Sequence, residues 1–186
     1  MTSAVVACVS GVVVALGLMG CAAEAAGDRG GDADSPSSSG GLVGHKAPGF
    51  SVKAVANGKG QLSLADLRGK VVLVDFWGTF CEPCKKSFPK LQDLYTKYSA
   101  SGLSIVGISE DEPDDKDSIP GFASSFGAKF ALGWDQDKTV AHAYKPQTMP
   151  SSFLIDRKGV VRYAHVGFHD GEEVEVEKEI KELLGQ

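Results

Sequence analysis

The chain lacks two features that would point to whole classes of protein. No cluster of Lys and Arg interleaved with aromatic residues occurs, and 19 basic residues face 24 acidic ones for a net charge of -5, so the sequence indicates no nucleic-acid partner. Only four cysteines are present (Cys8, Cys21, Cys81 and Cys84), which excludes a dense disulfide scaffold. The 186 residues, 42% hydrophobic and 23% charged, are typical of one globular domain.

The first three residues contain no Lys or Arg, but an apolar run follows them at residues 4–19. Its length fits the core of a signal peptide and is short for a membrane span. The run ends in Leu18-Met19-Gly20-Cys21, which resembles the bacterial lipobox, whose cysteine is lipidated and becomes the first mature residue. We therefore expect a lipoprotein signal peptide at 1–21, lipidation at Cys21, and a membrane-anchored extracytoplasmic protein. An uncleaved anchor or an ordinary secretory signal would also place the chain outside the cytoplasm.

Residues 22–43 are rich in Gly, Ser, Ala and Asp, and the composition predicts a flexible linker. Beyond it, strands and helices alternate, and a hairpin and a terminal helix close the pattern, which predicts an α/β fold with a central sheet. On the first long helix Phe88, Leu91 and Leu94 form the apolar stripe, and Ser87 is expected to face solvent. The predicted strands are 50–55 and 61–64 (a hairpin around Asn57-Gly58), 71–77, 103–108, 130–134, 152–155 and 160–166, and the helices are 82–99, 119–126, 138–144 and 171 onward.

The most informative feature is a buried strand that leads directly into Cys81-Glu82-Pro83-Cys84 and then into a helix. A helix N-terminus favours a thiolate, so we expect Cys81 to be the exposed, attacking sulfur and Cys84 to resolve the mixed disulfide. Lys85 should favour the Cys81 thiolate as well, whereas the carboxylate of Glu82 opposes it. Pro83 is tolerated in the first helical turn and stiffens the loop between the sulfurs.

Two acids are candidates for accepting the Cys84 proton. Asp75 lies on the buried strand before the motif, where an acid is costly without a function, and Glu110 lies at the end of the next strand. The sequence leaves open which of them acts. A third element, Met149-Pro150, precedes a strand, and a cis bond there would leave the Met149 backbone free to pair with an extended substrate.

The segments FWGTFCEPCKKSFP at residues 76–89 and MPSSF at 149–153 are similar to the TlpA/ResA branch of thioredoxin-like proteins. The resemblance implies a thioredoxin-like three-layer α/β/α domain over residues 44–186, with a mixed central sheet and an N-terminal β-hairpin extension. It also implies a monomeric, membrane-tethered, extracytoplasmic thiol–disulfide oxidoreductase without a cofactor. Such enzymes reduce apocytochrome c or other exported disulfide proteins with electrons from a CcdA/DsbD-type membrane protein.

The resemblance extends to individual site residues. Glu110 matches the active-site glutamate of ResA-like members, and Asp75 matches the buried aspartate of thioredoxin, where ResA-like proteins tend to be uncharged. Phe80 replaces the tryptophan that is usual before the first cysteine. The residues implied to line the substrate groove are Trp77, Phe80, Glu82, Pro83, Met149 and Pro150.

Several alternatives compete with this interpretation. A disulfide oxidase or isomerase would use the same chemistry and differ in reduction potential. A copper metallochaperone of the Sco kind has a related fold, but its cysteines are spaced one residue further apart. A static disulfide or half of a zinc site would need no thiol exchange, but a zinc site requires a second ligand pair, which the chain does not supply. A peroxiredoxin is disfavoured because its Pro-x-x-x-Thr/Ser-x-x-Cys loop is missing.

Overall fold

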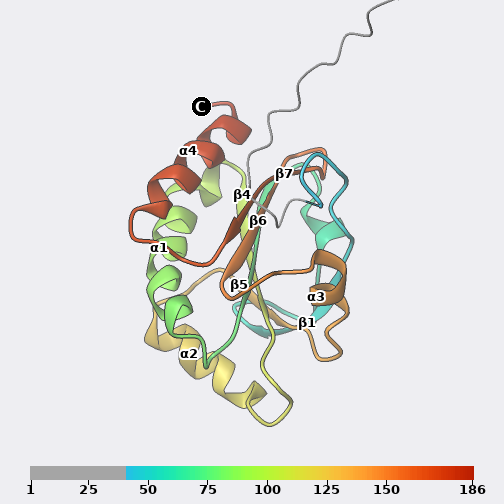
Figure 1. Cartoon of the computed structure of the whole chain (residues 1–186), viewed down its shortest axis with the longest axis vertical. Helices are drawn as coiled ribbons and strands as arrows, with labels where there is room; N and C mark the ends of the chain where they lie inside the picture. Colours follow the sequence, from blue (N-terminus) through green and yellow to red (C-terminus); the bar gives the residue numbers. More distant parts are fainter. Residues whose placement is uncertain (1–40) are drawn as a thin grey trace, which may run out of the picture. The chain divides into compact units, whose positions relative to one another are not determined.

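A mixed sheet of seven strands runs through residues 41–186, the part of the chain that the computed structural model describes (Figure 1). The predicted signal peptide, Cys21 and most of the predicted linker lie outside these residues. The strands are β1 (Ser51–Ala56), β2 (Gln61–Ser63), β3 (Val71–Trp77), β4 (Leu103–Ser109), β5 (Ala131–Trp134), β6 (Ser151–Ile155) and β7 (Val161–Val166). The helices are α1 (Glu82–Tyr98), α2 (Ile119–Ser125), α3 (Thr139–Tyr144) and α4 (Glu172–Leu184).

The strand order is β2-β1-β5-β4-β3-β6-β7. The three central strands β3, β4 and β5 are parallel, whereas β1, β2, β6 and β7 join their neighbours in antiparallel pairs. The carboxyl ends of β3 and β4 therefore meet at one edge of the sheet, and Trp77 pairs in register with Ser109 there. This edge carries both Cys81 and Glu110, each just beyond a strand end.

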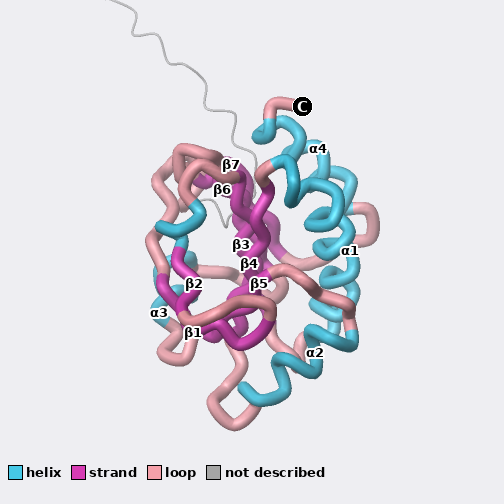
Figure 2. The backbone as a smooth tube through the Cα atoms, turned by 180° about the vertical axis from the view of Figure 1, so that it is seen from behind, coloured by secondary structure: helices cyan, strands magenta, loops and turns pink. Residues whose placement is uncertain are grey.

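Two hydrophobic cores lie on opposite faces of the sheet, because side chains along a strand alternate between faces. Val71, Leu73 and Trp77 of β3 pack with residues of α1, α2 and α4, while Val72, Val74 and Phe76 pack with residues of α3. Figure 2 shows the same arrangement from behind, with α1, α2 and α4 on one side of the strands and α3 on the other. The predicted three-layer thioredoxin-like fold with its N-terminal hairpin is confirmed.

The structure corrects one expectation about α1. Ser87 is not on the solvent side of the helix: it is 6% exposed, and its hydroxyl donates to the backbone carbonyl of Cys84 at 3.2 Å. A serine that satisfies its own hydroxyl on the helix backbone can be buried at little cost, and the apolar periodicity does not reveal this. Among the described helices, none has both the length and the apolar character needed to span a membrane.

Candidate active site

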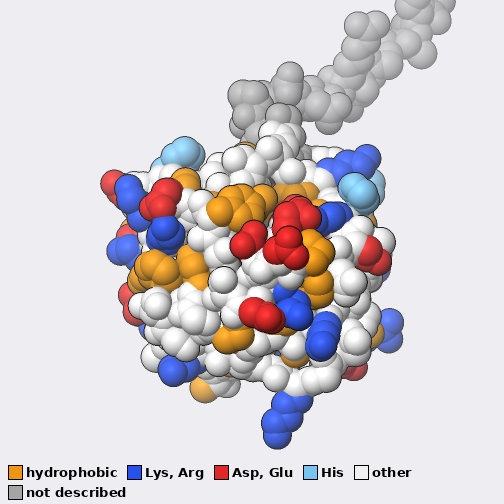
Figure 3. Space-filling model, turned by 90° about the horizontal axis from the view of Figure 1, so that it is seen from below, with side chains coloured by type: hydrophobic (Ala, Val, Ile, Leu, Met, Phe, Trp, Pro, Cys, Tyr) orange, Lys and Arg blue, Asp and Glu red, His pale blue; other side chains and the backbone are white. Residues whose placement is uncertain are grey.

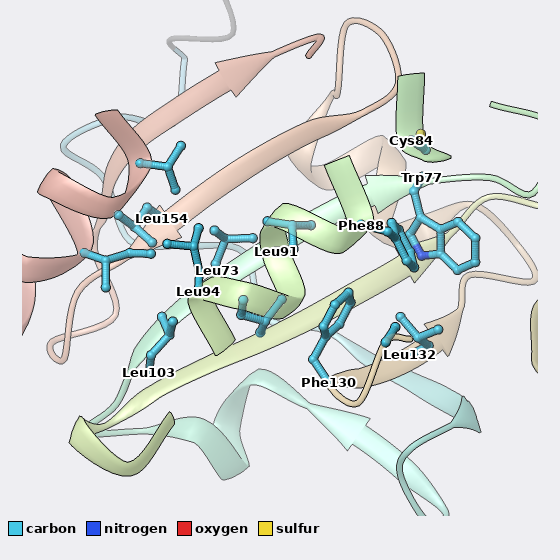
Figure 4. Close-up of a cluster of buried hydrophobic side chains, with 14 of the residues drawn as sticks. Leu73, Trp77, Cys84, Phe88, Leu91, Leu94, Leu103, Phe130, Leu132 and Leu154 are labelled. Atoms are coloured by element: carbon cyan, nitrogen blue, oxygen red, sulfur yellow. The ribbon is translucent and has the colours of Figure 1, made fainter. Parts of the chain in front are cut away.

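Cys81 and Cys84 form a disulfide at the N-terminus of α1, with their Cα atoms 5.3 Å apart. Cys81 is the N-cap residue, and its Sγ accepts a hydrogen bond from the backbone N–H of Cys84 at 3.2 Å. In a reduced protein the same N–H would stabilise negative charge on the Cys81 sulfur. Cys81 is 5% exposed and Cys84 is fully buried, so the prediction of an exposed Cys81 is wrong for the disulfide-bonded state, although Cys81 is the more accessible of the two. Figure 4 shows Cys84 next to Trp77 and Phe88 of the core.

The two charged side chains nearest the disulfide in sequence, Glu82 and Lys85, form an ion pair with each other. Lys85 forms an ion pair with Glu82 one turn earlier in the helix, and the Glu82 side chain is 79% exposed. The pairing weakens both the favourable influence of Lys85 and the unfavourable influence of Glu82 on a Cys81 thiolate. Pro83 lies in the first turn of α1, as predicted, and is exposed together with Glu82.

The loop that delivers Cys81 is held by a residue that the sequence reasoning missed. Asp111 is 1% exposed, and its carboxylate accepts the Thr79 backbone N–H at 3.0 Å and the Thr79 and Ser109 hydroxyls at 2.5 and 2.7 Å. The acid-rich run of residues 110–117 predicts a solvated loop, and this interpretation is wrong for Asp111. Its signal in the sequence was its place three residues after the predicted buried strand 103–108.

An open hollow of about 560 Å³ adjoins Phe80, the residue that precedes Cys81, and its lining also includes Met149, Glu110 and Lys138. Phe80 is 62% exposed, and a Cβ on Gly78 would come within 2.6 Å of its ring, so the ring lies directly over the glycine. Figure 3, which views the end of the molecule where α1 begins, shows hydrophobic and acidic side chains next to each other with basic ones among them. Phe80 and Met149 line the same hollow, and the exposed Phe80 ring is free to contact a partner; their role in a substrate groove stays a prediction.

Glu110 is one of the residues that line this hollow. Its carboxylate oxygen Oε1 is buried and has no hydrogen-bond partner within residues 41–186. Burial raises the pKa of Glu110, against the lowering influence of the Lys138 charge. Lys138 donates to the Glu110 backbone carbonyl. A carboxyl group whose pKa is raised by burial is better suited to exchange a proton than an ordinary surface glutamate.

Asp75 does not line this hollow. It lies in a separate small cavity under α1 and α4. The cavity is about 40 Å³, and Ser87, Pro150, Ser152 and Glu172 line it together with Asp75. Asp75 is 2% exposed, and its Oδ2 has no hydrogen-bond partner among the described residues. Burial raises the pKa of Asp75 well above its usual range, and the charge of Glu172 adds to the effect. Asp75 occupies the face of β3 that carries Trp77, the face on which Cys84 packs.

The cis Met149-Pro150 bond connects the two hollows: Met149 lines the outer one and Pro150 the inner one. Asp75 and Glu110 are thus both close to the active-site end of the sheet but line different walls. Trp77 is fully buried, packed on Phe88 with ring centroids 4.5 Å apart, and has no surface to offer a substrate, contrary to its predicted role. No group of three or more metal-ligating side chains occurs in residues 41–186.

A redox-active Cys-x-x-Cys at a helix N-terminus, beside a cis-proline on a thioredoxin-like sheet, defines a thiol–disulfide oxidoreductase. Residues 43–164 match the model of the AhpC/TSA family. The chain is 35% identical over 133 residues to the thiol–disulfide oxidoreductase ResA of Bacillus anthracis, covering 72% of this chain and 75% of that protein. It is 40% identical over 118 residues to ResA of Bacillus subtilis, covering 63% of this chain and 64% of that protein. The chain belongs to the AhpC/TSA family, in the ResA-like group of thiol–disulfide oxidoreductases.

Solved structures agree with this assignment. A structure described as the thiol:disulfide interchange protein DsbE of Chlorobium tepidum superposes with a TM-score of 0.69 at 35% identity, over 75% of this chain and 96% of that chain. A Bacteroides thetaiotaomicron structure described as a protein disulfide isomerase gives a TM-score of 0.68 at 30% identity, over 77% and 91% of the two chains.

Proposed function

We propose that this oxidoreductase is a reductase of exported proteins, apocytochrome c among them, and that it works as an extracytoplasmic, monomeric lipoprotein anchored through Cys21. The observation that carries the proposal is the setting of the disulfide. Cys81 caps α1 beside an exposed Phe80, and Met149 lines the same open hollow. A protein substrate bound in this hollow would lie next to Cys81, the more accessible of the two cysteines, whereas Cys84 is fully buried.

The cycle follows from these positions. The Cys81 thiolate attacks one sulfur of a substrate disulfide, and the other substrate sulfur leaves as a thiolate. Cys84 then loses its proton to Asp75 or Glu110 and attacks the Cys81 sulfur, which closes the Cys81–Cys84 disulfide and releases the second substrate thiolate. A CcdA/DsbD-type membrane protein restores the dithiol. We infer that Pro150 and the Met149 backbone bind the substrate strand.

Trapping tests the choice of substrate. A Cys84→Ser variant in cells should accumulate mixed disulfides between Cys81 and exported proteins, and mass spectrometry of complexes that a reductant releases should identify apocytochrome c. The Cys81→Ser/Cys84→Ser double variant is the matched control and should trap nothing. Recovery of no exported protein with Cys84→Ser would contradict the proposal.

The direction of the reaction needs a separate measurement, because an oxidase or isomerase would trap substrates as well. We expect a reduction potential near that of thioredoxin, about -270 mV, rather than near the roughly -120 mV of a strong oxidant.

Replacement of Cys21 by Ala should release the protein from the membrane fraction if Cys21 carries the anchor. Retention of the Cys21→Ala protein in membranes would contradict lipidation at this residue.

A further inference from the structure

Three polar residues lie side by side on adjacent strands of the sheet, on the face that α1 and α4 cover. Asp75 of β3 pairs with Ser152 of β6, and Ser152 pairs with His165 of β7. Residues directly opposite one another in antiparallel strands project from the same face of a sheet. The row therefore leads from the acid behind the active site to a histidine under the first turns of α4.

His165 is held there by two carboxylates of α4. Its Nε2 lies 2.7 Å from Oε2 of Glu179, and its Nδ1 lies 3.6 Å from Oε1 of Glu172. The side chains of His165, Glu172 and Glu179 are 14%, 15% and 11% exposed. Burial lowers the pKa of His165, but the hydrogen bond to Glu179 and the charges of Glu179, Glu172 and Glu175 outweigh it, so the pKa is raised. The His165 ring thus lies between the two acids and holds Glu179 by a hydrogen bond.

Glu172 connects this cluster with Asp75, because both side chains line the same cavity. A water molecule needs about 10–15 Å³, so the cavity of about 40 Å³ has room for more than one. The Asp75 Oδ2 atom is the buried polar atom there without a partner among the described residues. Glu172 retains some contact with solvent at its side chain. Its Oε2 also accepts the His169 backbone N–H at 3.2 Å.

The other acids near the cavity are less suited to exchange a proton with Asp75. Glu173 lines the cavity, but its carboxylate pairs with Lys90 of α1 at 3.0 Å and accepts the Gly171 backbone N–H at 3.1 Å. Glu179 is bonded to His165 and does not line the cavity. Glu175 is on the exposed side of α4. Glu172 is thus the carboxylate of the cavity lining that is partly exposed to solvent and is not paired with a lysine of the described residues.

Building on the proposed function, we propose that Glu172, held in place by His165, is a positioning residue that carries the proton from Asp75 to solvent. Asp75 takes the proton from the Cys84 thiol, and the Cys84 thiolate attacks the Cys81 sulfur of the mixed disulfide. The Cys81–Cys84 bond forms as the bond from Cys81 to the substrate breaks, and the substrate leaves as a thiolate. The Asp75 proton passes through cavity water to the Glu172 carboxylate and then to bulk water, where the substrate thiolate recovers a proton. No further oxidant or reductant is required.

The test separates the two chemical steps in the reduced, full-length protein in detergent. After rapid mixing with a chromogenic aryl disulfide, attack by Cys81 releases one coloured thiol, and resolution by Cys84 releases the second. Glu172→Gln should leave the first release unchanged and slow the second by about tenfold at neutral pH, which is less than the roughly 10²–10⁴-fold of direct acid–base catalysis because Asp75 itself is retained. Glu182→Gln, which removes the same charge from an exposed place on α4, should change neither.

Two further readouts distinguish proton transfer from a structural effect. Glu172→Asp should recover part of the second rate. Glu172→Gln should also move the pH profile of the second release to lower pH, because a negative charge near Asp75 is lost. In an Asp75→Asn background, Glu172→Gln should slow the second release no further, because the two residues act in series.

An unchanged second release in Glu172→Gln would overturn the inference and leave the proposed function intact. So would equal slowing by Glu172→Gln in the wild-type and Asp75→Asn proteins. If the wild-type protein released no thiol in the first phase, the proposed function itself would be contradicted, and this inference with it.

Discussion

Thr79 donates both its backbone N–H and its hydroxyl to the carboxylate of Asp111, at 3.0 and 2.5 Å. The two residues are 32 positions apart, on the loop before Cys81 and on the loop after β4. Asp111 also accepts from Ser109, and its backbone carbonyl accepts the Trp134 indole N–H at 2.8 Å. One buried residue thus ties the redox loop to the end of the neighbouring strand through its side chain and to β5 through its backbone.

Asp111→Asn should lower the free energy of unfolding by about 2–3 kcal/mol, because the amide replaces one acceptor by a donor and leaves a buried donor unpaired. Chemical denaturation of the oxidised proteins measures the change. Asp114→Asn is the matched control, since Asp114 is exposed in the same loop and its loss should have little effect. Equal stability of the two variants would show that the carboxylate does not hold the loop.

Phe80→Ala should impair the reaction with protein disulfides and spare the reaction with small ones. The side chain is 62% exposed, so its removal should change the melting temperature little. It borders the hollow beside Cys81, where a large substrate would contact it and a small aryl disulfide need not. We expect kcat/KM for a protein disulfide to fall by about tenfold, the cost of about 1.4 kcal/mol of contact. Parallel losses with both kinds of substrate would instead indicate a change at Cys81.

Asp75→Asn should stabilise the oxidised protein above the ordinary pKa of aspartate. The folded state raises the Asp75 pKa, so the folded protein keeps a proton that the unfolded chain releases. Stability from this group is therefore present at low pH and is lost as the pH rises from the unfolded pKa through the folded one. At about pH 7 we expect a gain of about 1–3 kcal/mol for Asp75→Asn, shrinking towards about pH 3.

The measurement is urea denaturation across this pH range. Asp93→Asn, at an exposed position of α1, is the control and should show no such pH dependence. A wild-type protein whose stability does not fall, relative to Asp75→Asn, as the pH rises would contradict a raised Asp75 pKa.

His165→Asn should have its largest effect at the lower end of the pH range, because the folded state raises the His165 pKa as it raises the Asp75 pKa. The His165 pKa is raised in the folded protein, so the ion pairs with Glu179 and Glu172 contribute fully below the unfolded pKa of about 6.5. Their contribution is lost as the pH rises through the folded pKa. We expect a loss of about 1–3 kcal/mol near pH 6 that becomes smaller near pH 9. His45→Asn, at an exposed residue, should be neutral at both pH values; a pH-independent loss in His165→Asn would indicate packing rather than charge.

Local patterns in the sequence were sufficient for the chemistry and for the order of the elements. The apolar run of β3, the Cys81-Glu82-Pro83-Cys84 motif and the helix stripe with Phe88 depend on neighbours a few residues away, so the strand, the disulfide and α1 follow from the order of residues alone. The Asn57-Gly58 turn fixed the hairpin of β1 and β2 for the same reason.

Burial and long-range pairing, in contrast, were decided by the tertiary structure. Trp77 is closed off by Phe88 and Phe122, and the buried position of Asp111 depends on Thr79 and Trp134, residues distant from it in sequence. The sequence presented Asp75 and Glu110 as equivalent acids. The fold places the two acids in different hollows, and Glu172 and His165 lie close to Asp75 and not to Glu110. Strand register and the packing of α4 on the sheet bring these residues together, and both join segments that are distant in the sequence.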